Sequence, residues 1–331
     1  MKQIVTFCDL NFFKILVKNL YMLQIRSKSE NKHLFIESTL PKFLTAVRQK
    51  TLKNEITFKG IGLHTGNKVS MKIFPADENT GIVFRRNIGN KIILIKAEYT
   101  NVKSTKLCTL LSDNNGNSVS TVEHILSALY AFEIDNVIID LTSNEIPVYD
   151  GSAQDFVMKI KEVGFEEQES FKKFIKIKKP VEVKSGKKYA RVCPFDNTLI
   201  STEINYDHKL IGKQSISVML TPQIYESQIC KARTFGFLKD VENLRRNNLA
   251  LGGNLDNAIV LDEDNVLNKD GLRFSDEFVR HKLLDFIGDI SLSGYRMLGS
   301  FFSSHPGHEM NIQLLKRVFQ SPNNWELVCS N

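Results

Sequence analysis

The pattern of apolar and polar positions after residue 50 is that of short strands interrupted by glycine, asparagine and proline. Apolar segments bounded by such turn residues are typical of β-strands. Within this region Ser120 and Glu123 have the spacing of a capping box, which predicts a helix through Phe132. A second helix is expected to start near Ser152. The expected strands are 56–59, 69–74, 82–85, 91–97 and 136–141.

A second run of elements with the same order begins near Lys173. It predicts strands at 174–177, 181–183, 189–193 and 199–205, and later helices, from a period of about 3.6 residues, at 240–247, 276–290 and 310–319. The order of strands followed by helices occurs twice in the chain. It indicates the α+β class, because a doubly wound sheet would have strands and helices in alternation. We therefore expect two similar domains, each a sheet packed with helices, at 50–171 and 172–321, and a C-terminal tail at 322–331.

The first 49 residues differ in composition from the rest of the chain, because they contain no glycine and a single proline. Apolar and basic residues alternate over 11–26. This leaves three readings open: a disordered extension, an amphipathic helix in peripheral contact with a membrane, or a targeting segment, with Met22 as an alternative start. No apolar stretch reaches the roughly 20 residues that a membrane-spanning helix needs. We expect a cytoplasmic protein, which would lie at the inner-membrane surface if the extension binds there. If the extension is a transit peptide, the protein would be organellar. We expect that catalysis does not need residues 1–49.

Charge and cysteine content narrow the classes of function. The chain has 44 Lys/Arg and 37 Asp/Glu, but nine of the basic and three of the acidic residues lie in the first 50 positions, so the remainder is nearly neutral. A nearly neutral body argues against a nucleic-acid partner. Five widely spaced cysteines without a CxxC pair argue against a disulfide framework or a thiolate zinc site, and fit a reducing compartment.

Ionisable residues at helical spacing indicate a metal site. His281 and Asp285 are four residues apart in the helix expected at 276–290, so they share one face and could bind one divalent ion. A catalytic zinc takes about three protein ligands, and His124 is the best third ligand because Glu123 beside it could act as a base. Taken alone, an HxxxD pair is more often an ordinary polar pair. The apolar neighbours nevertheless predict a buried helix, in which unpaired polar groups are costly.

The glycines at 60, 62 and 66 do not form a nucleotide-binding motif, because no Lys-Ser/Thr follows them and no βαβ unit surrounds them. They predict a hairpin turn. His64 lies in this turn. Its side chain either faces a functional site or forms its hydrogen bonds with the backbone.

Six longer motifs are informative as a set: GIGLHTG at 60–66, STVEH at 120–124, IPVYDGSA at 146–153, ARTFGF at 232–237, LDNAIV at 255–260 and DEFVRHKLLDFIGD at 276–289. In sequence, order and spacing they resemble the UDP-3-O-acyl-N-acetylglucosamine deacetylases, the zinc amidases of lipid A synthesis. The resemblance covers roughly residues 50–320. It implies two similar α+β domains with the active site between them.

The resemblance also implies which residues carry the chemistry. Those that match the family's zinc ligands are His124, His281 and Asp285, and Glu123 matches its general base. The second catalytic group, a protonated histidine, matches His308, and the carboxylate that orients and charges it matches Asp289. Thr234 resembles the residue whose hydroxyl helps to stabilise the tetrahedral intermediate.

Substrate contacts are implied in the same way. Lys282 resembles a residue that reaches polar groups of the substrate, and Phe235 one that packs beside the sugar. Tyr206 resembles a uracil-stacking aromatic residue, although Phe235 and Tyr206 could equally be core or strand residues. His305 stands where a Lys or Arg is expected, which changes a phosphate contact. The segment 204–220 is expected to be the family's second-domain insert, which lines a passage for the acyl chain.

The expected function is zinc-dependent release of acetate from UDP-3-O-acyl-N-acetylglucosamine, the committed step of lipid A biosynthesis, by a monomer. The alternative is a protein that keeps the fold and the nucleotide-sugar and acyl pocket but has lost catalysis. The sequence offers little for this alternative, because none of the expected ligands or the base is missing.

Overall fold

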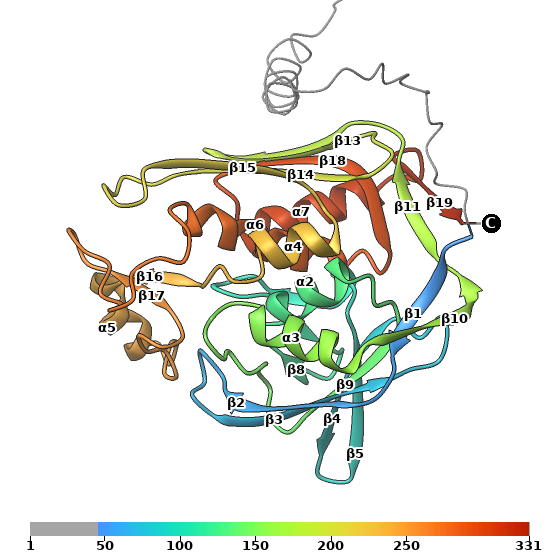
Figure 1. Cartoon of the computed structure of the whole chain (residues 1–331), viewed down its shortest axis with the longest axis horizontal. Helices are drawn as coiled ribbons and strands as arrows, with labels where there is room; N and C mark the ends of the chain where they lie inside the picture. Colours follow the sequence, from blue (N-terminus) through green and yellow to red (C-terminus); the bar gives the residue numbers. More distant parts are fainter. Residues whose placement is uncertain (1–45, 331) are drawn as a thin grey trace, which may run out of the picture. The chain divides into compact units, whose positions relative to one another are not determined.

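The computed structural model describes residues 46–330, in which helices from both halves of the chain lie between two main sheets (Figure 1). In the first sheet, alternate residues of a strand such as β3 are buried, as expected where one face packs on a core. Helices α2 (Glu123–Ala131) and α3 (Gln154–Val163) lie on the inner side of this sheet. Its strands, in spatial order, are β2 (Ile56–Ile61), β3 (Lys68–Pro75), β9 (Val137–Leu141), β4 (Ile82–Ile88) and β5 (Lys91–Lys96).

The second sheet has seven strands from the C-terminal half of the chain. Its centre is β18, which runs parallel to β11 and β14 and antiparallel to β13. Helices α4 (Pro222–Gln228), α6 (Glu277–Ser291) and α7 (His308–Phe319) lie on the side that faces the first sheet (Figure 1). The strands are β11 (Lys173–Ile177), β12 (Val181–Ser185), β13 (Lys188–Cys193), β14 (Thr198–Asn205), β15 (Lys213–Met219), β18 (Arg296–Ser304) and β19 (Trp325–Cys329).

Helix α6 lies at the centre of the core. Its apolar residues, among them Phe278, Leu284 and Phe286, are completely buried, as expected of a helix covered on all sides. It packs against α2, and Gly288 makes the close crossing possible, because a Cβ at this position would lie 2.1 Å from the carbonyl oxygen of Glu123. The crossing brings the polar start of α2 next to the middle of α6.

Smaller elements complete the described part of the chain. A three-stranded sheet contains β6 (Val102–Ser104), β7 (Leu110–Ser112) and β8 (Ser118–Val119). The pair β1 (Arg48–Leu52) and β10 (Phe165–Phe171) is antiparallel, and a 3-10 turn spans Tyr99–Asn101. At one side of the molecule, β16 (Phe235–Phe237), α5 (Leu238–Arg246) and β17 (Ile259–Leu261) form a separate unit with a parallel strand pair (Figure 1).

The predicted α+β class is confirmed, and the predicted strands and helices occur within three residues of their expected bounds. The predicted capping box is wrong. The residue before α2 is Val122, with no side-chain capping bond, and the Ser120 hydroxyl donates to the carbonyl oxygen of Asn144 instead. Ser120 pairs with the segment around 144–146, so it is held by tertiary contacts that local spacing does not encode.

The ends of the fold extend beyond the expected limits. Strand β1 begins at Arg48, and the buried Gln49 exchanges side-chain hydrogen bonds with Asn79 and Asn136. The expected C-terminal tail contains β19, which pairs with β11. The segment 204–220 contributes to the hairpin of β14 and β15 in the seven-stranded sheet, and its apolar residues pack against β17. The acyl-chain passage expected there stays a prediction.

The helix and membrane contact expected for residues 11–26 lie outside the described residues. Within residues 46–330, no helix has the length and apolar character that crossing a bilayer requires.

Candidate functional site

The crossing of α2 and α6 brings together three side chains of the kind that bind metal ions. Their candidate ligand atoms, one each from His124, His281 and Asp285, lie within 4.8 Å of one another, and all three side chains are buried. Asp285 Oδ1 is 3.4 Å from His281 Nε2 and 3.7 Å from His124 Nε2. The sequence predicted the pairing of His281 with Asp285 from their spacing on one helix face, and His124 joins them from α2. We call these residues the His–His–Asp group.

Hydrogen bonding and burial favour neutral imidazoles and an ionised carboxylate in this group. His281 Nδ1 lies 3.1 Å from the carbonyl oxygen of Ala232, which can only accept, so Nδ1 carries the proton and Nε2 keeps a lone pair. Burial lowers the pKa of His124 to about 3 and also lowers the pKa of His281, so both rings are neutral near pH 7. Burial alone would raise the pKa of Asp285, but attraction to His281 and to Lys282 outweighs it and lowers the pKa well below its ordinary value.

A second cluster lies beside the first. His308, the first residue of α7, has its Nδ1 at 2.8 Å from Asp289 Oδ2 and its Nε2 at 3.6 Å from Glu123 Oε1. Burial alone would lower the pKa of His308, but the carboxylates of Asp289 and Glu123 outweigh it and raise the pKa to about 10. Burial raises the pKa of Glu123 to about 7, against the opposing effect of His308. We call Glu123, Asp289 and His308 the carboxylate–histidine group.

Two residues of this region were not found from the sequence. Thr109 donates its backbone N–H to Glu123 Oε2 at 3.1 Å and its hydroxyl to Asp289 Oδ1 at 2.6 Å. Asn311, on α7, donates its side-chain amide to Asp289 Oδ2 at 2.8 Å. Both are completely buried. Neither lies in one of the six motifs, and the only local signal for Asn311 is that it follows His308 by three residues, one turn along the same helix.

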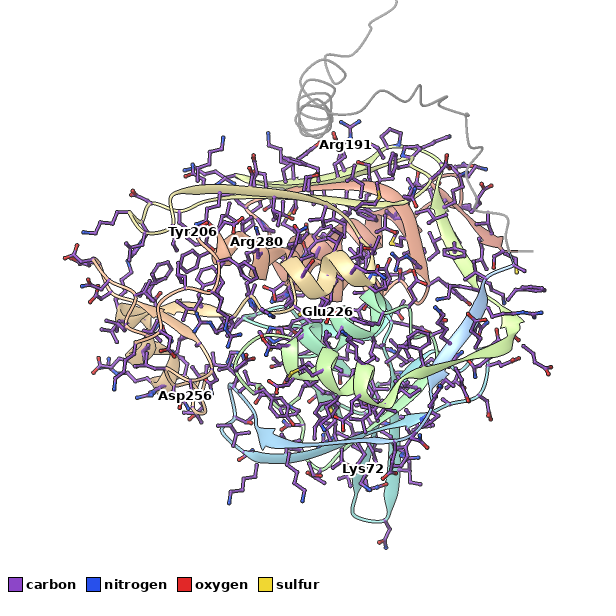
Figure 2. All side chains as sticks on the ribbon, in the orientation of Figure 1. Lys72, Arg191, Tyr206, Glu226, Asp256 and Arg280 are labelled. Atoms are coloured by element: carbon purple, nitrogen blue, oxygen red, sulfur yellow. The ribbon has the colours of Figure 1, made fainter. Side chains whose placement is uncertain are left out.

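Three of the expected substrate-contact residues, Lys282, Phe235 and Tyr206, are joined to the His–His–Asp group by a series of contacts. Lys282 donates to Asp285 Oδ2 at 2.9 Å, and its Nζ lies 5.4 Å from the centre of the Phe235 ring. The Phe235 ring centre is 6.4 Å from that of His281 and 5.9 Å from that of Tyr206. Figure 2 shows Tyr206 on the side of the molecule that carries β16, β17 and α5. These contacts form a continuous polar and aromatic surface from Asp285 to Tyr206.

Thr234 is held in place by two hydrogen bonds of its backbone, one to Gly151 and one to Ile259. Its N–H donates to the carbonyl oxygen of Gly151 at 2.8 Å, and its carbonyl oxygen accepts from the N–H of Ile259 at 2.8 Å. The first of these bonds depends on a close approach, because a Cβ at Gly151 would lie 2.1 Å from the carbonyl oxygen of Asn257. Thr234 therefore lies where elements from both halves of the chain meet.

Two further histidines lie near the start of α7 and in the turn between β2 and β3. His305 has a left-handed backbone (φ 52°), and its Nδ1 is 3.1 Å from the hydroxyl of Ser304. The predicted hairpin turn around His64 is confirmed by the antiparallel pairing of β2 with β3. His64 Nδ1 accepts a long bond of 3.4 Å from the N–H of Ala250, while its Nε2 is buried without a hydrogen-bond partner among the described residues.

Comparison with known proteins shows the family of the chain. A family model described as LpxC, UDP-3-O-acyl N-acetylglycosamine deacetylase, matches residues 49–320. A protein of Idiomarina loihiensis named UDP-3-O-acyl-N-acetylglucosamine deacetylase is 46% identical over 284 residues, which cover 85% of this chain and 93% of that protein. Proteins with the same name from Haemophilus influenzae and Pseudomonas entomophila are 45% and 46% identical over the same shares. The chain therefore belongs to the UDP-3-O-acyl N-acetylglycosamine deacetylase family.

Proposed function

We propose that the protein is a zinc-dependent amide hydrolase that removes acetate from UDP-3-O-acyl-N-acetylglucosamine. The observation that carries the proposal is the side-by-side burial of a His–His–Asp group and a carboxylate–histidine group at the crossing of α2 and α6. Hydrolysis of an amide needs both a strong nucleophile and a proton for the leaving amine. The names of the relatives supply the substrate.

The donor set suits zinc. Two neutral imidazoles and one carboxylate match the three protein ligands of catalytic zinc sites, which keep one position open. The Nδ1 bond of His281 to Ala232 fixes the ring with Nε2 toward Asp285. Zinc bound here would act as a Lewis acid, polarising the amide carbonyl and bringing the pKa of a water from 15.7 toward about 7.

The carboxylate–histidine group would move the two protons. Glu123 is the general base that takes a proton from the attacking water. Its Oε2 accepts from the N–H of Thr109, whereas its Oε1 faces His308 at 3.6 Å. His308 is held protonated by Asp289 and donates its Nε2 proton to the leaving amine. Glu123 gains one proton and His308 loses one, so the total number of protons on the two residues is unchanged by the hydrolysis.

The polar and aromatic surface beyond Asp285 is the proposed substrate surface. Lys282 would contact polar groups of the substrate, and Phe235 would pack beside the sugar ring. Tyr206 would stack on the uracil, Thr234 would stabilise the tetrahedral intermediate, and His305 would contact a phosphate. The ring contacts that lead from His281 through Phe235 to Tyr206 support the roles of Phe235 and Tyr206, whereas those of Thr234 and His305 rest on the motifs that resemble the family.

Acetate release from UDP-3-O-acyl-N-acetylglucosamine tests the proposal. We expect turnover that a chelator abolishes and stoichiometric zinc restores. A folded, zinc-loaded protein that binds the substrate but releases no acetate would contradict the proposal and favour the non-catalytic alternative.

A further inference from the structure

Thr109 is bonded to both carboxylates of the carboxylate–histidine group, although it is absent from the six motifs. It directly precedes β7 and is completely buried, and Leu107 before it has a left-handed backbone (φ 68°). Its carbonyl oxygen accepts a 3.4 Å bond from the N–H of Val122, at the entrance of α2. Its N–H and hydroxyl reach Glu123 and Asp289. The residue before β7 is thus bonded to both α2 and α6.

These bonds assign separate tasks to the carboxylate oxygens. Glu123 Oε2 accepts from Thr109, whereas Oε1 faces His308. Asp289 Oδ1 accepts from the Thr109 hydroxyl, whereas Oδ2 accepts from Asn311 and faces His308 Nδ1 at 2.8 Å. An ionised carboxylate can only accept, so the hydroxyl must be the donor, and such charge-assisted bonds are the stronger kind. Thr109 therefore contacts both carboxylates, with its N–H at Glu123 and its hydroxyl at Asp289, and shares Asp289 with Asn311 and His308.

We propose that Thr109 is a positioning residue that fixes Glu123 and Asp289 relative to each other, so that the base and His308 face the same reacting bond. The inference rests on the proposed function and adds a residue that acts through these two carboxylates without touching the substrate. Positioning of this kind matters because a displacement of about 1 Å can cost on the order of 10²-fold in rate.

Replacing the hydroxyl while keeping the shape tests this role. Thr109→Val should lower kcat by about 10- to 100-fold with KM within about twofold of wild type and zinc content unchanged. Thr109→Ser keeps the hydroxyl and should recover kcat to within about threefold. The matched control is Thr198→Val, which removes a buried hydroxyl bonded to the Met297 carbonyl in the seven-stranded sheet. It should destabilise the protein in the same way and leave kcat unchanged.

Three results would overturn the inference: a kcat of Thr109→Val within threefold of wild type, equal losses in the Val and Ser variants, or loss of zinc with activity. A readout without turnover separates this inference from the proposed function. The proton resonance of His308 Nδ1–H, assigned by its absence in His308→Ala, should persist in Thr109→Ser and shift or broaden in Thr109→Val. If wild type releases no acetate, the proposed function fails, and an unchanged resonance in Thr109→Val would separately refute the positioning role.

Discussion

The His–His–Asp group and the carboxylate–histidine group lie side by side at one helix crossing and are equally buried, yet they are bonded differently. In the first, Asp285 Oδ1 faces two neutral imidazole nitrogens at 3.4 and 3.7 Å, distances too long for good hydrogen bonds. In the second, Asp289 accepts hydrogen bonds of 2.6 and 2.8 Å from Thr109 and Asn311 and has His308 at 2.8 Å.

The difference separates a group whose candidate ligand atoms are not bonded to one another from a group that is joined by internal hydrogen bonds. The three candidate ligand atoms lie within 4.8 Å of one another without a good hydrogen bond between them, and Lys282 donates to the other oxygen of Asp285. This arrangement favours a metal ion. The carboxylate–histidine group contains its own cation, because His308 is protonated between the carboxylates of Asp289 and Glu123. Changes in the first group should therefore alter metal content, whereas changes in the second should alter proton transfer.

Removing a ligand should have the largest effect. We expect His281→Ala and Asp285→Ala to lose zinc and to lower acetate release by about 10³-fold or more, because the electrophile and the activated water are both lost. Metal analysis of the purified variants, together with their turnover, checks this. Zinc content equal to wild type in both variants would show that these residues are not ligands.

Removing the negative charge of Asp289 beside His308 should have an intermediate effect on the rate of acetate release. Asp289→Asn keeps the shape but removes the negative charge that raises the pKa of His308 to about 10. We expect kcat to fall by about 10- to 100-fold, with zinc retained and the alkaline limb of the pH profile moved to lower pH. An alkaline limb in the wild-type position would mean that another group supplies the proton.

The pH profile of wild type reports the carboxylate–histidine group directly. Glu123 must be deprotonated, so the rate should rise with pH through a pKa no higher than about 7. His308 must be protonated, so the rate should fall through a pKa no higher than about 10. A bound cation lowers both pKa values. A profile without the alkaline fall would argue against His308 as the acid.

Truncation should have the smallest effect, because the residues of both groups lie within the described residues 46–330. Deleting residues 1–45 should leave kcat and zinc content within about twofold of wild type. Extending the deletion through Gln49 removes its bonds to Asn79 and Asn136 and should cost about 1–3 kcal/mol of unfolding free energy, read from urea denaturation. Loss of zinc in the shorter deletion would show that the extension is part of the catalytic fold.

Sequence patterns predicted the elements with strong periodicity and the residues that lie in motifs. The helix at 276–290 was predictable because its apolar positions and its His281 and Asp285 follow one helical period. Thr109 was not, since its contacts to Glu123 and Asp289 join residues 14 and 180 positions away. The capping box failed for a related reason: Ser120 is bonded to Asn144, a tertiary contact that competes with the local pattern.

Two adjacent residues of α2 provide the most direct test that the two groups are separate. Zinc content and turnover should be measured for Glu123→Gln and His124→Ala, prepared in parallel. We predict that Glu123→Gln keeps stoichiometric zinc and loses about 10²- to 10⁴-fold in kcat, whereas His124→Ala loses the zinc as well. Equal zinc loss in both variants would show that Glu123 is a ligand and would contradict the account.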